Sequence, residues 1–119
     1  MNYNYINLEY LDLMSDGDMD MKKVMIDMLL EEVPTEIEKL AQMEQANDWN
    51  QLKEVSHKLK STLAFIGNST MTTSNERVEE IAKTVTGVEE LPALINTLME
   101  TYPHALEELR SVSTVLEAA

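Results

Sequence analysis

The chain has 119 residues, a formal net charge of −13 and 44% apolar residues, enough for the core of one globular domain. It has no cysteine, so it forms no disulfide, thiolate metal site or cysteine nucleophile, and its acidic surface would repel nucleic acid. No apolar run approaches the roughly 20 residues of a membrane span, and residues 1–5 lack the basic start of a secretory signal, so we expect a cytoplasmic protein.

The first part of the chain predicts a short helix followed by a long one. The short helix covers Leu8 to Met14, and the turn Ser-Asp-Gly-Asp at residues 15–18 separates it from the next segment. A helical pattern then extends from about residue 18 to 46. Because Pro34 lies inside this stretch and removes a helical hydrogen bond, we expect a kink or a break near Val33.

Three further helices are predicted from apolar residues spaced three and four apart. The third segment covers residues 49–66, and the fourth begins at the cap Asn68 and ends at Gly87. The last helix has Pro92 in its first turn, and we expect a kink at Pro103. The apolar stripes are Leu52, Val55, Leu59, Leu63 and Ile66; Met71, Ser74, Val78, Ile81, Ala82 and Val85; and Leu91, Leu94, Ile95, Leu98, Tyr102, Leu106, Leu109, Val112 and Leu116.

Amphipathic helices joined by short connections pack as antiparallel neighbours. The sequence therefore predicts an all-α fold, an up-and-down four-helix bundle with an extra short N-terminal helix. We expect one domain, in which residues 1–17 form the N-terminal helix and turn and residues 18–117 form the bundle.

The third predicted helix has a histidine on the side opposite its apolar stripe. His57 lies about 200° around the helix from both Val55 and Leu59, so its side chain is expected to point to solvent. No Asp or Glu occurs between residues 55 and 75, which suits a site that receives a negative group. The basic and small residues on the same side of the helix are Lys53, Lys60, Ser61 and Ala64.

A carboxylate on the next helix is expected to contact this histidine. In an antiparallel pair, residues at equal distances from the turn face each other, and the turn centres near Asn68. His57 precedes Asn68 by 11 residues and Glu79 follows it by 11, with Glu80 as the alternative if the turn shifts by one. A carboxylate that accepts the Nδ1 hydrogen fixes the tautomer and leaves Nε2 free as a nucleophile.

These residue types suit transfer of a phosphoryl group. The transfer needs in-line access and a cation for the equatorial oxygens, and Lys60 can supply that cation. Ser61 and Ala64 are small, so another protein can approach closely. The sequence has no glycine-rich nucleotide loop and no carboxylate cluster at metal-binding spacing, so we expect neither kinase activity nor a metal site. The phosphate is then expected to arrive from a donor protein.

The same stretch resembles the histidine-containing phosphotransfer (HPt) domain. The family signature is His-x-x-Lys, then a small residue, then a glycine ten positions after the histidine, which corresponds to His57, Lys60, Ser61 and Gly67. Glycine is the commonest residue of the family at the position of Ser61. The family often has Gln or Glu 22 residues after the histidine, which corresponds to Glu79.

The resemblance extends from about residue 18 to 116, including Pro34 and the connection at residues 45–49. It implies a helical bundle with an exposed histidine that relays phosphate between receiver-domain aspartates in two-component signalling. The expected partners are receiver domains of response regulators and hybrid histidine kinases. The protein would need no cofactor of its own, and Mg²⁺ would belong to the partner receiver.

Two alternatives remain open at this stage. The methionines of the long second segment, including Met25 and Met28, can fill the core or form an adaptable docking surface, to which Lys53 and Lys58 could contribute. The chain could also be a non-catalytic helical adaptor that docks a receiver or kinase domain without carrying phosphate. The second histidine, His104, is predicted to be a surface residue without a role.

Overall fold

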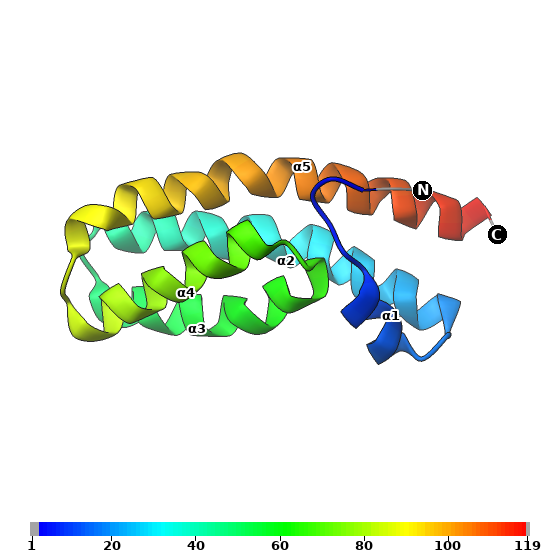
Figure 1. The fold of residues 1–119 in the computed structure, drawn as a ribbon, viewed down its shortest axis with the longest axis horizontal. Coiled ribbons are helices and arrows are strands. Elements are labelled where there is room, and N and C mark those ends of the chain that lie inside the picture. The colour runs from blue at the N-terminus through cyan, green and yellow to red at the C-terminus, as the bar shows by residue number, and fades with distance from the viewer. Residues whose placement is uncertain (1–2, 119) are drawn as a thin grey trace.

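The computed structural model describes residues 3–118, so Met1, Asn2 and Ala119 lie outside the described residues. Within this range every regular element is a helix, which confirms the predicted all-α class (Figure 1). The elements are α1 (Glu9–Ser15), α2 (Met19–Gln45), α3 (Trp49–Ile66), α4 (Ser69–Thr84), the short 3-10 helix η1 (Val88–Glu90) and α5 (Leu91–Ala118).

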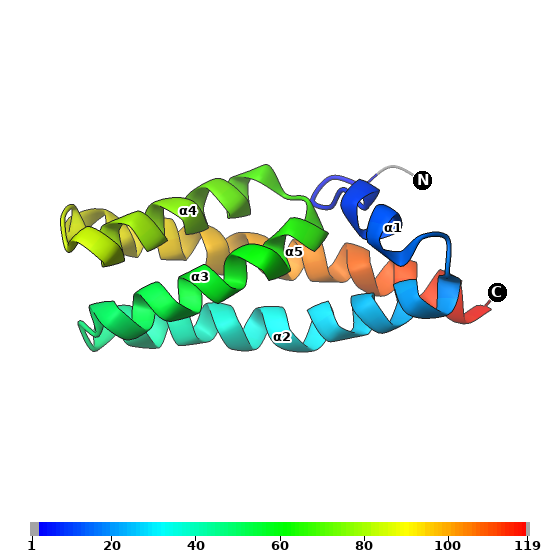
Figure 2. The same ribbon diagram turned by 90° about the horizontal axis from the view of Figure 1, so that it is seen from below.

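Helices α2 to α5 form an elongated four-helix bundle of about 48 × 22 × 19 Å (Figures 1 and 2). Each of them packs against two others, since α2 contacts α3 and α5, and α4 also contacts α3 and α5. Because α3 and α4 are shorter than α2 and α5, one end of the bundle has only two helices. The short helix α1 packs there against α2 and α3, as predicted for an extra N-terminal helix.

Side-chain caps set the starts of the three helices that position the site. Asp18, Asp48 and Asn68 each accept a hydrogen bond from the backbone N–H three residues later. Helix α3 ends at Gly67, whose φ of 72° is the left-handed conformation that glycine adopts without a Cβ penalty. The short α3–α4 turn therefore makes these two helices antiparallel neighbours.

Helix α2 continues through Pro34, so of the kink or break expected near Val33 the break does not occur. A proline in the interior of a helix costs about 3 kcal/mol. However, Leu29, Val33 and Ile37 lie on one buried face before and after the proline. Burial of this continuous face against the core outweighs the local cost, since most helix stability in proteins comes from tertiary packing. Helix α5 likewise continues through Pro103.

Helix α4 ends at Thr84 rather than at Gly87, and Val85 is not part of its buried face. The reason is that Val85 adopts a left-handed conformation, with φ at 52°, and its N–H closes the helix by donating to Ile81 O at 2.7 Å. Gly87, with φ at 82°, instead precedes η1. A β-branched residue rarely adopts positive φ, so the sequence pattern alone favoured one more helical position.

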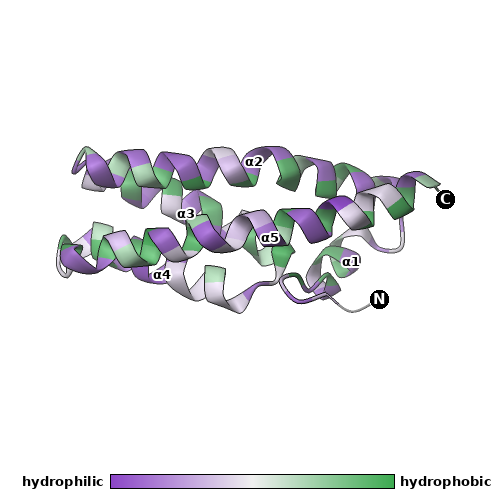
Figure 3. Ribbon diagram, turned by 90° about the horizontal axis from the view of Figure 1, so that it is seen from above, coloured by the Kyte–Doolittle hydropathy of each residue, from purple (hydrophilic) through white to green (hydrophobic). Residues whose placement is uncertain are grey.

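The predicted apolar stripes otherwise form the core. Figure 3 shows hydrophobic residues recurring at helical intervals among hydrophilic ones along the bundle. Four of the predicted stripe residues, Val55, Leu94, Tyr102 and Leu116, are only half-buried at its edge. The fully enclosed members include Leu52, Leu59, Leu63 and Ile66 of α3, Met71, Val78 and Ile81 of α4, and Leu91, Leu98 and Leu109 of α5. No helix within residues 3–118 is long and apolar enough to cross a membrane.

The N-terminal segment, residues 3–8, is held against the bundle by hydrogen bonds over long sequence distances. The backbone N–H groups of residues 4, 5 and 6 all donate to the carboxylate of Glu108 on α5, at 2.8 to 3.2 Å. Asn7 N–H donates to Ile66 O at 2.8 Å, at the end of α3. The segment thus joins the α3–α4 turn to α5.

Candidate functional site

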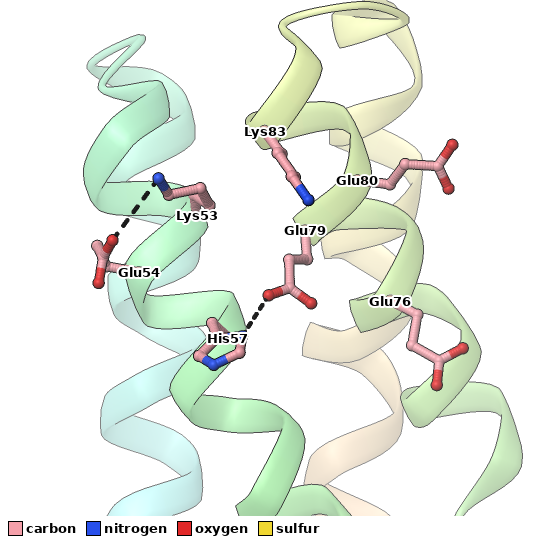
Figure 4. Close-up of a pocket in the computed structure, with 7 residues that line it drawn as sticks. All are labelled: Lys53, Glu54, His57, Glu76, Glu79, Glu80 and Lys83. Carbon is pink, nitrogen blue, oxygen red and sulfur yellow. Dashed lines mark hydrogen bonds and ion pairs between the residues drawn. The ribbon is translucent and has the colours of Figure 1, made fainter.

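His57 lies near the middle of α3 with its side chain 74% exposed. Its Nδ1 is 2.6 Å from Oε2 of Glu79 on α4, whose side chain is only 23% exposed (Figure 4). An ionised carboxylate can only accept hydrogen bonds, so the neutral ring carries its hydrogen on Nδ1 and its lone pair on Nε2. The contact that the turn symmetry predicted is present, and the ring nitrogen opposite it has the lone pair.

The alternative carboxylate, Glu80, faces a different partner. Its Oε1 lies 3.2 Å from a terminal nitrogen of Arg77, and in Figure 4 its side chain points away from His57. Arg77 also donates to Glu90 at 2.7 Å. The hydrogen bond between these two raises the pKa of Arg77 and lowers the pKa of Glu90. The observed register of α3 and α4 therefore places Glu79, and not Glu80, against the imidazole.

His57 and Glu79 lie in an open groove of about 470 Å³ between α3 and α4 (Figure 4). Both walls carry both signs of charge, because α3 contributes Lys53 and Glu54 beside His57, and α4 contributes three glutamates and a lysine. Sequence reasoning missed Lys83, which lies one turn after Glu79; the i,i+4 spacing from Glu79 was the available signal. The lining residues are Lys53, Glu54, His57, Glu76, Glu79, Glu80 and Lys83.

The lysines of α3 differ in their partners. Lys53 lies 3.7 Å from Glu54, and Lys58 lies 3.7 Å from Glu36 of α2. Lys60 is exposed one turn after His57 and forms no ion pair with any residue from 3 to 118. Lys60 is not among the residues that line the groove, whose lysines are Lys53 and Lys83.

A family model described as the Hpt domain matches residues 24–112. The chain belongs to the Hpt domain family. This confirms the resemblance drawn from the histidine motif, and it gives the chain a phosphotransfer-type role in two-component systems. Comparison with the curated proteins and with the solved structures gave no significant match.

The small residues of the Hpt motif lie in two different environments. Ser61 and Ala64 are exposed on α3, on the side of His57. Gly67 lies at the end of α3, about 15 Å from His57 at 1.5 Å per residue. A Cβ at Gly67 would clash with the backbone oxygen of Asn7, so the close approach seen at this glycine is by the N-terminal segment.

An apolar groove of about 260 Å³ begins one turn after His57, where Ser61 lines it. We call it the Met–Phe groove. Met28 is about half exposed, whereas Met25 is partly buried and packs against the core, and both predicted docking methionines line this groove. Tyr10 of α1 packs against Phe65, with ring centroids 5.1 Å apart. The groove is lined by Met25, Met28, Leu29, Glu32, Ser61, Thr62 and Phe65.

Within residues 3–118 of this Hpt domain, no three His, Cys, Asp or Glu side chains come together in a group that could hold a metal ion. The chemistry available at the groove is that of the imidazole itself, one carboxylate beside it and the lysines of α3 and α4. On α2, remote from the groove, the hydrogen bond between Lys23 and Asp27 raises the pKa of Lys23 and lowers the pKa of Asp27.

Proposed function

We propose that this Hpt domain carries a phosphoryl group on His57 between the aspartates of two receiver domains. The single observation that supports this most strongly is the His57–Glu79 contact. The contact holds the hydrogen on Nδ1, so the lone pair is on Nε2, and the ring is largely exposed to solvent.

In the forward step, Nε2 of His57 attacks the phosphorus of a receiver phosphoaspartate. The Nε2–P bond forms, the bond from phosphorus to the aspartate oxygen breaks, and the aspartate leaves as a carboxylate. The hydrogen stays on Nδ1 and keeps its hydrogen bond to Glu79, whose negative charge balances the positive charge that develops on the ring. The second transfer is the same step in reverse, with the aspartate of another receiver as the nucleophile.

Lys60 would bind the phosphoryl oxygens as they pass between the two proteins. Phosphoryl transfer depends on positioning and charge stabilisation more than on covalent work by the protein. The Mg²⁺ ion would come with the receiver domain. The chain would therefore act as a phosphocarrier in the cytoplasm, with no kinase activity of its own.

The exposed face of α3 and the Met–Phe groove would form the receiver contact surface. Ser61 and Ala64 leave room beside His57, and Met25 and Met28 provide adaptable apolar contacts. Lys53 has an exposed ion pair with Glu54 at 3.7 Å, and Lys58 is exposed but lies 3.7 Å from the buried Glu36; both lysines can turn toward acidic groups of a partner.

The test is phosphotransfer from a panel of phosphorylated receiver domains, followed by intact-mass and peptide mass spectrometry. A mass gain of one phosphate that is lost in mild acid and maps to His57 supports the proposal. A receiver that binds tightly, stays phosphorylated and never labels His57 would instead support a non-catalytic adaptor. Labelling from ATP without any donor protein would contradict the phosphocarrier proposal.

A further inference from the structure

Two polar side chains, Ser56 and Asn75, are buried between α3 and α4. Ser56 is fully buried and Asn75 is 1% exposed. The hydroxyl of Ser56 lies 2.8 Å from Oδ1 and 3.0 Å from the backbone oxygen of Asn75. In return, Nδ2 of Asn75 donates to the backbone oxygen of Ser56 at 2.9 Å. The Ser56 hydroxyl therefore contacts both the side chain and the backbone of Asn75, and the Asn75 side chain contacts the backbone of Ser56.

This pair lies next to the His57–Glu79 contact on the same helix interface. Ser56 directly precedes His57 on α3, and Asn75 lies one turn before Glu79 on the same side of α4. Fixing Ser56 relative to Asn75 therefore also fixes His57 relative to Glu79. The pair is shielded from solvent, whereas His57 itself is not.

Apart from the His57–Glu79 contact itself, the side chains that α3 and α4 bury in this region are apolar and have little directional preference. Side chains such as Leu59, Leu63 and Val78 could repack if one helix moved along the other. Hydrogen bonds between buried groups do not tolerate such a shift, because a buried donor or acceptor left without a partner is costly. The pair thus supplies buried, directional hydrogen bonds at this interface.

We infer that the Ser56–Asn75 pair sets the register of α3 and α4, and thereby positions Glu79 against Nδ1 of His57. A shift of α4 along α3 would take Glu79 away from the ring, and Glu80 is paired with Arg77. Ser56 and Asn75 are positioning residues, since their side chains hydrogen-bond each other's helix and act on the imidazole through Glu79. Their effect on phosphotransfer rests on the proposed function, but their effect on the histidine ring does not.

The consequence concerns which ring nitrogen carries the hydrogen. With Glu79 in place, the hydrogen is held on Nδ1 and the lone pair is on Nε2. With the register free, the hydrogen can move to Nε2, and that tautomer cannot attack phosphorus through Nε2. Loss of the pair should therefore change the tautomer population of His57 and slow its phosphorylation.

The test uses the double variant Ser56→Ala/Asn75→Leu, which removes both partners and so leaves no unpaired polar side chain. The matched control is Ser113→Ala, which removes another buried serine whose hydroxyl bonds Asp27 across α2 and α5 at 3.1 Å. The first readout is the ¹⁵N NMR spectrum of the His57 ring, which reports the tautomer. The second is the rate of His57 phosphorylation by phosphoramidate, a small-molecule donor.

The expected result is a mixed His57 tautomer and about a tenfold slower reaction in the folded double variant, with both readouts unchanged in Ser113→Ala. A folded double variant that keeps the Nδ1–H tautomer and the wild-type rate would overturn the inference. If the double variant does not fold, Ser56→Ala alone serves, because the bond from Asn75 Nδ2 to the Ser56 backbone can remain. A smaller shift of the same sign is expected there, and an unchanged ring overturns the inference.

Both readouts are independent of any receiver domain. A wild-type protein that takes phosphate from no receiver would contradict the proposed function. The comparison of the His57 ring spectra of the wild type and the double variant would still decide the role of Ser56 and Asn75. Conversely, normal transfer from a receiver to a double variant with an unchanged ring would retain the proposed function and reject the positioning role.

Discussion

The two histidines of the chain both lie on exposed helix faces, but their surroundings differ. His57 contacts a carboxylate from the neighbouring helix and opens onto a charged groove. His104 stacks on Tyr5 of the N-terminal segment, with ring centroids 4.8 Å apart and an angle of 17° between the planes. Exposure is therefore common to both, and the carboxylate that holds one ring nitrogen distinguishes the first.

The nearby carboxylates show the same contrast. Glu79 bonds the ring of His57, whereas Glu108, one turn after His104, accepts three backbone N–H groups of residues 4–6. One carboxylate serves a side chain that can react, and the other holds a segment of backbone in place. The comparison predicts that substitutions near His57 change chemistry, and that substitutions near His104 change stability.

The largest expected effect is that of replacing the histidines themselves. His57→Gln should abolish acid-labile labelling by a phosphorylated receiver, because no lone pair remains at the position of Nε2. Receiver binding, measured by titration calorimetry, should change little. His104→Gln is the matched control and should keep the wild-type labelling rate. Loss of labelling in His104→Gln would show that the two sites have been assigned the wrong way round.

The next effect concerns the carboxylate beside His57. Glu79→Gln keeps an acceptor for the Nδ1 hydrogen but removes the negative charge, so phosphorylation should slow about tenfold, or roughly 1.4 kcal/mol in the barrier. Glu80→Gln, which affects a residue paired with Arg77, should leave the rate within about twofold. The measurement is the initial rate with a saturating phosphorylated receiver. Equal effects of the two variants would contradict the observed register.

On the His104 side, Glu108→Ala should lower stability and leave the chemistry intact. Three backbone donors lose a charged acceptor, for which we expect a loss of about 2 kcal/mol in the free energy of unfolding. Urea unfolding followed by circular dichroism gives this value. Glu107→Ala, at an exposed position beside it, should cost less than about 0.5 kcal/mol. Slower phosphorylation of the Glu108→Ala variant would contradict the prediction that substitutions near His104 change stability and not chemistry.

The smallest effect is expected from the ion pair that flanks the His57 groove. Because Arg77 lowers the pKa of Glu90 below its ordinary value of 4.5, the pair adds stability above that value and loses it as the pH falls through the lowered pKa. Glu90→Gln should therefore be slightly less stable than wild type at pH 7 and equal to it well below pH 4.5. Unfolding measured at both pH values tests the sign. A gap that widens in acid would contradict it.

The sequence predicted most helices because apolar spacing and caps are local signals. It also predicted the His57–Glu79 contact, since both residues lie equally far from one short turn. The unbroken helix at Pro34 depends on packing against other helices, which a local proline rule does not include. The left-handed Val85 likewise runs against the usual preference of its residue type.

The Glu108 contact and the Ser56–Asn75 pair could not be predicted for a different reason. Glu108 bonds residues about a hundred positions earlier in the chain, and no period in the sequence links them. Ser56 and Asn75 are polar residues at buried positions, and a search for apolar stripes passes over them. Both contacts depend on the three-dimensional arrangement that the stripes produce.

The attachment of residues 4–6 to Glu108 also has a consequence for the order of folding. These bonds close a loop of nearly the whole chain, so they form only after α5 has packed, when the cost of loop closure has already been met. The amide hydrogens of Asn4, Tyr5 and Ile6 should then exchange with solvent by a local opening of this segment. In that opened form, α3 and α4 retain their own contacts, and His57 keeps its partner on α4.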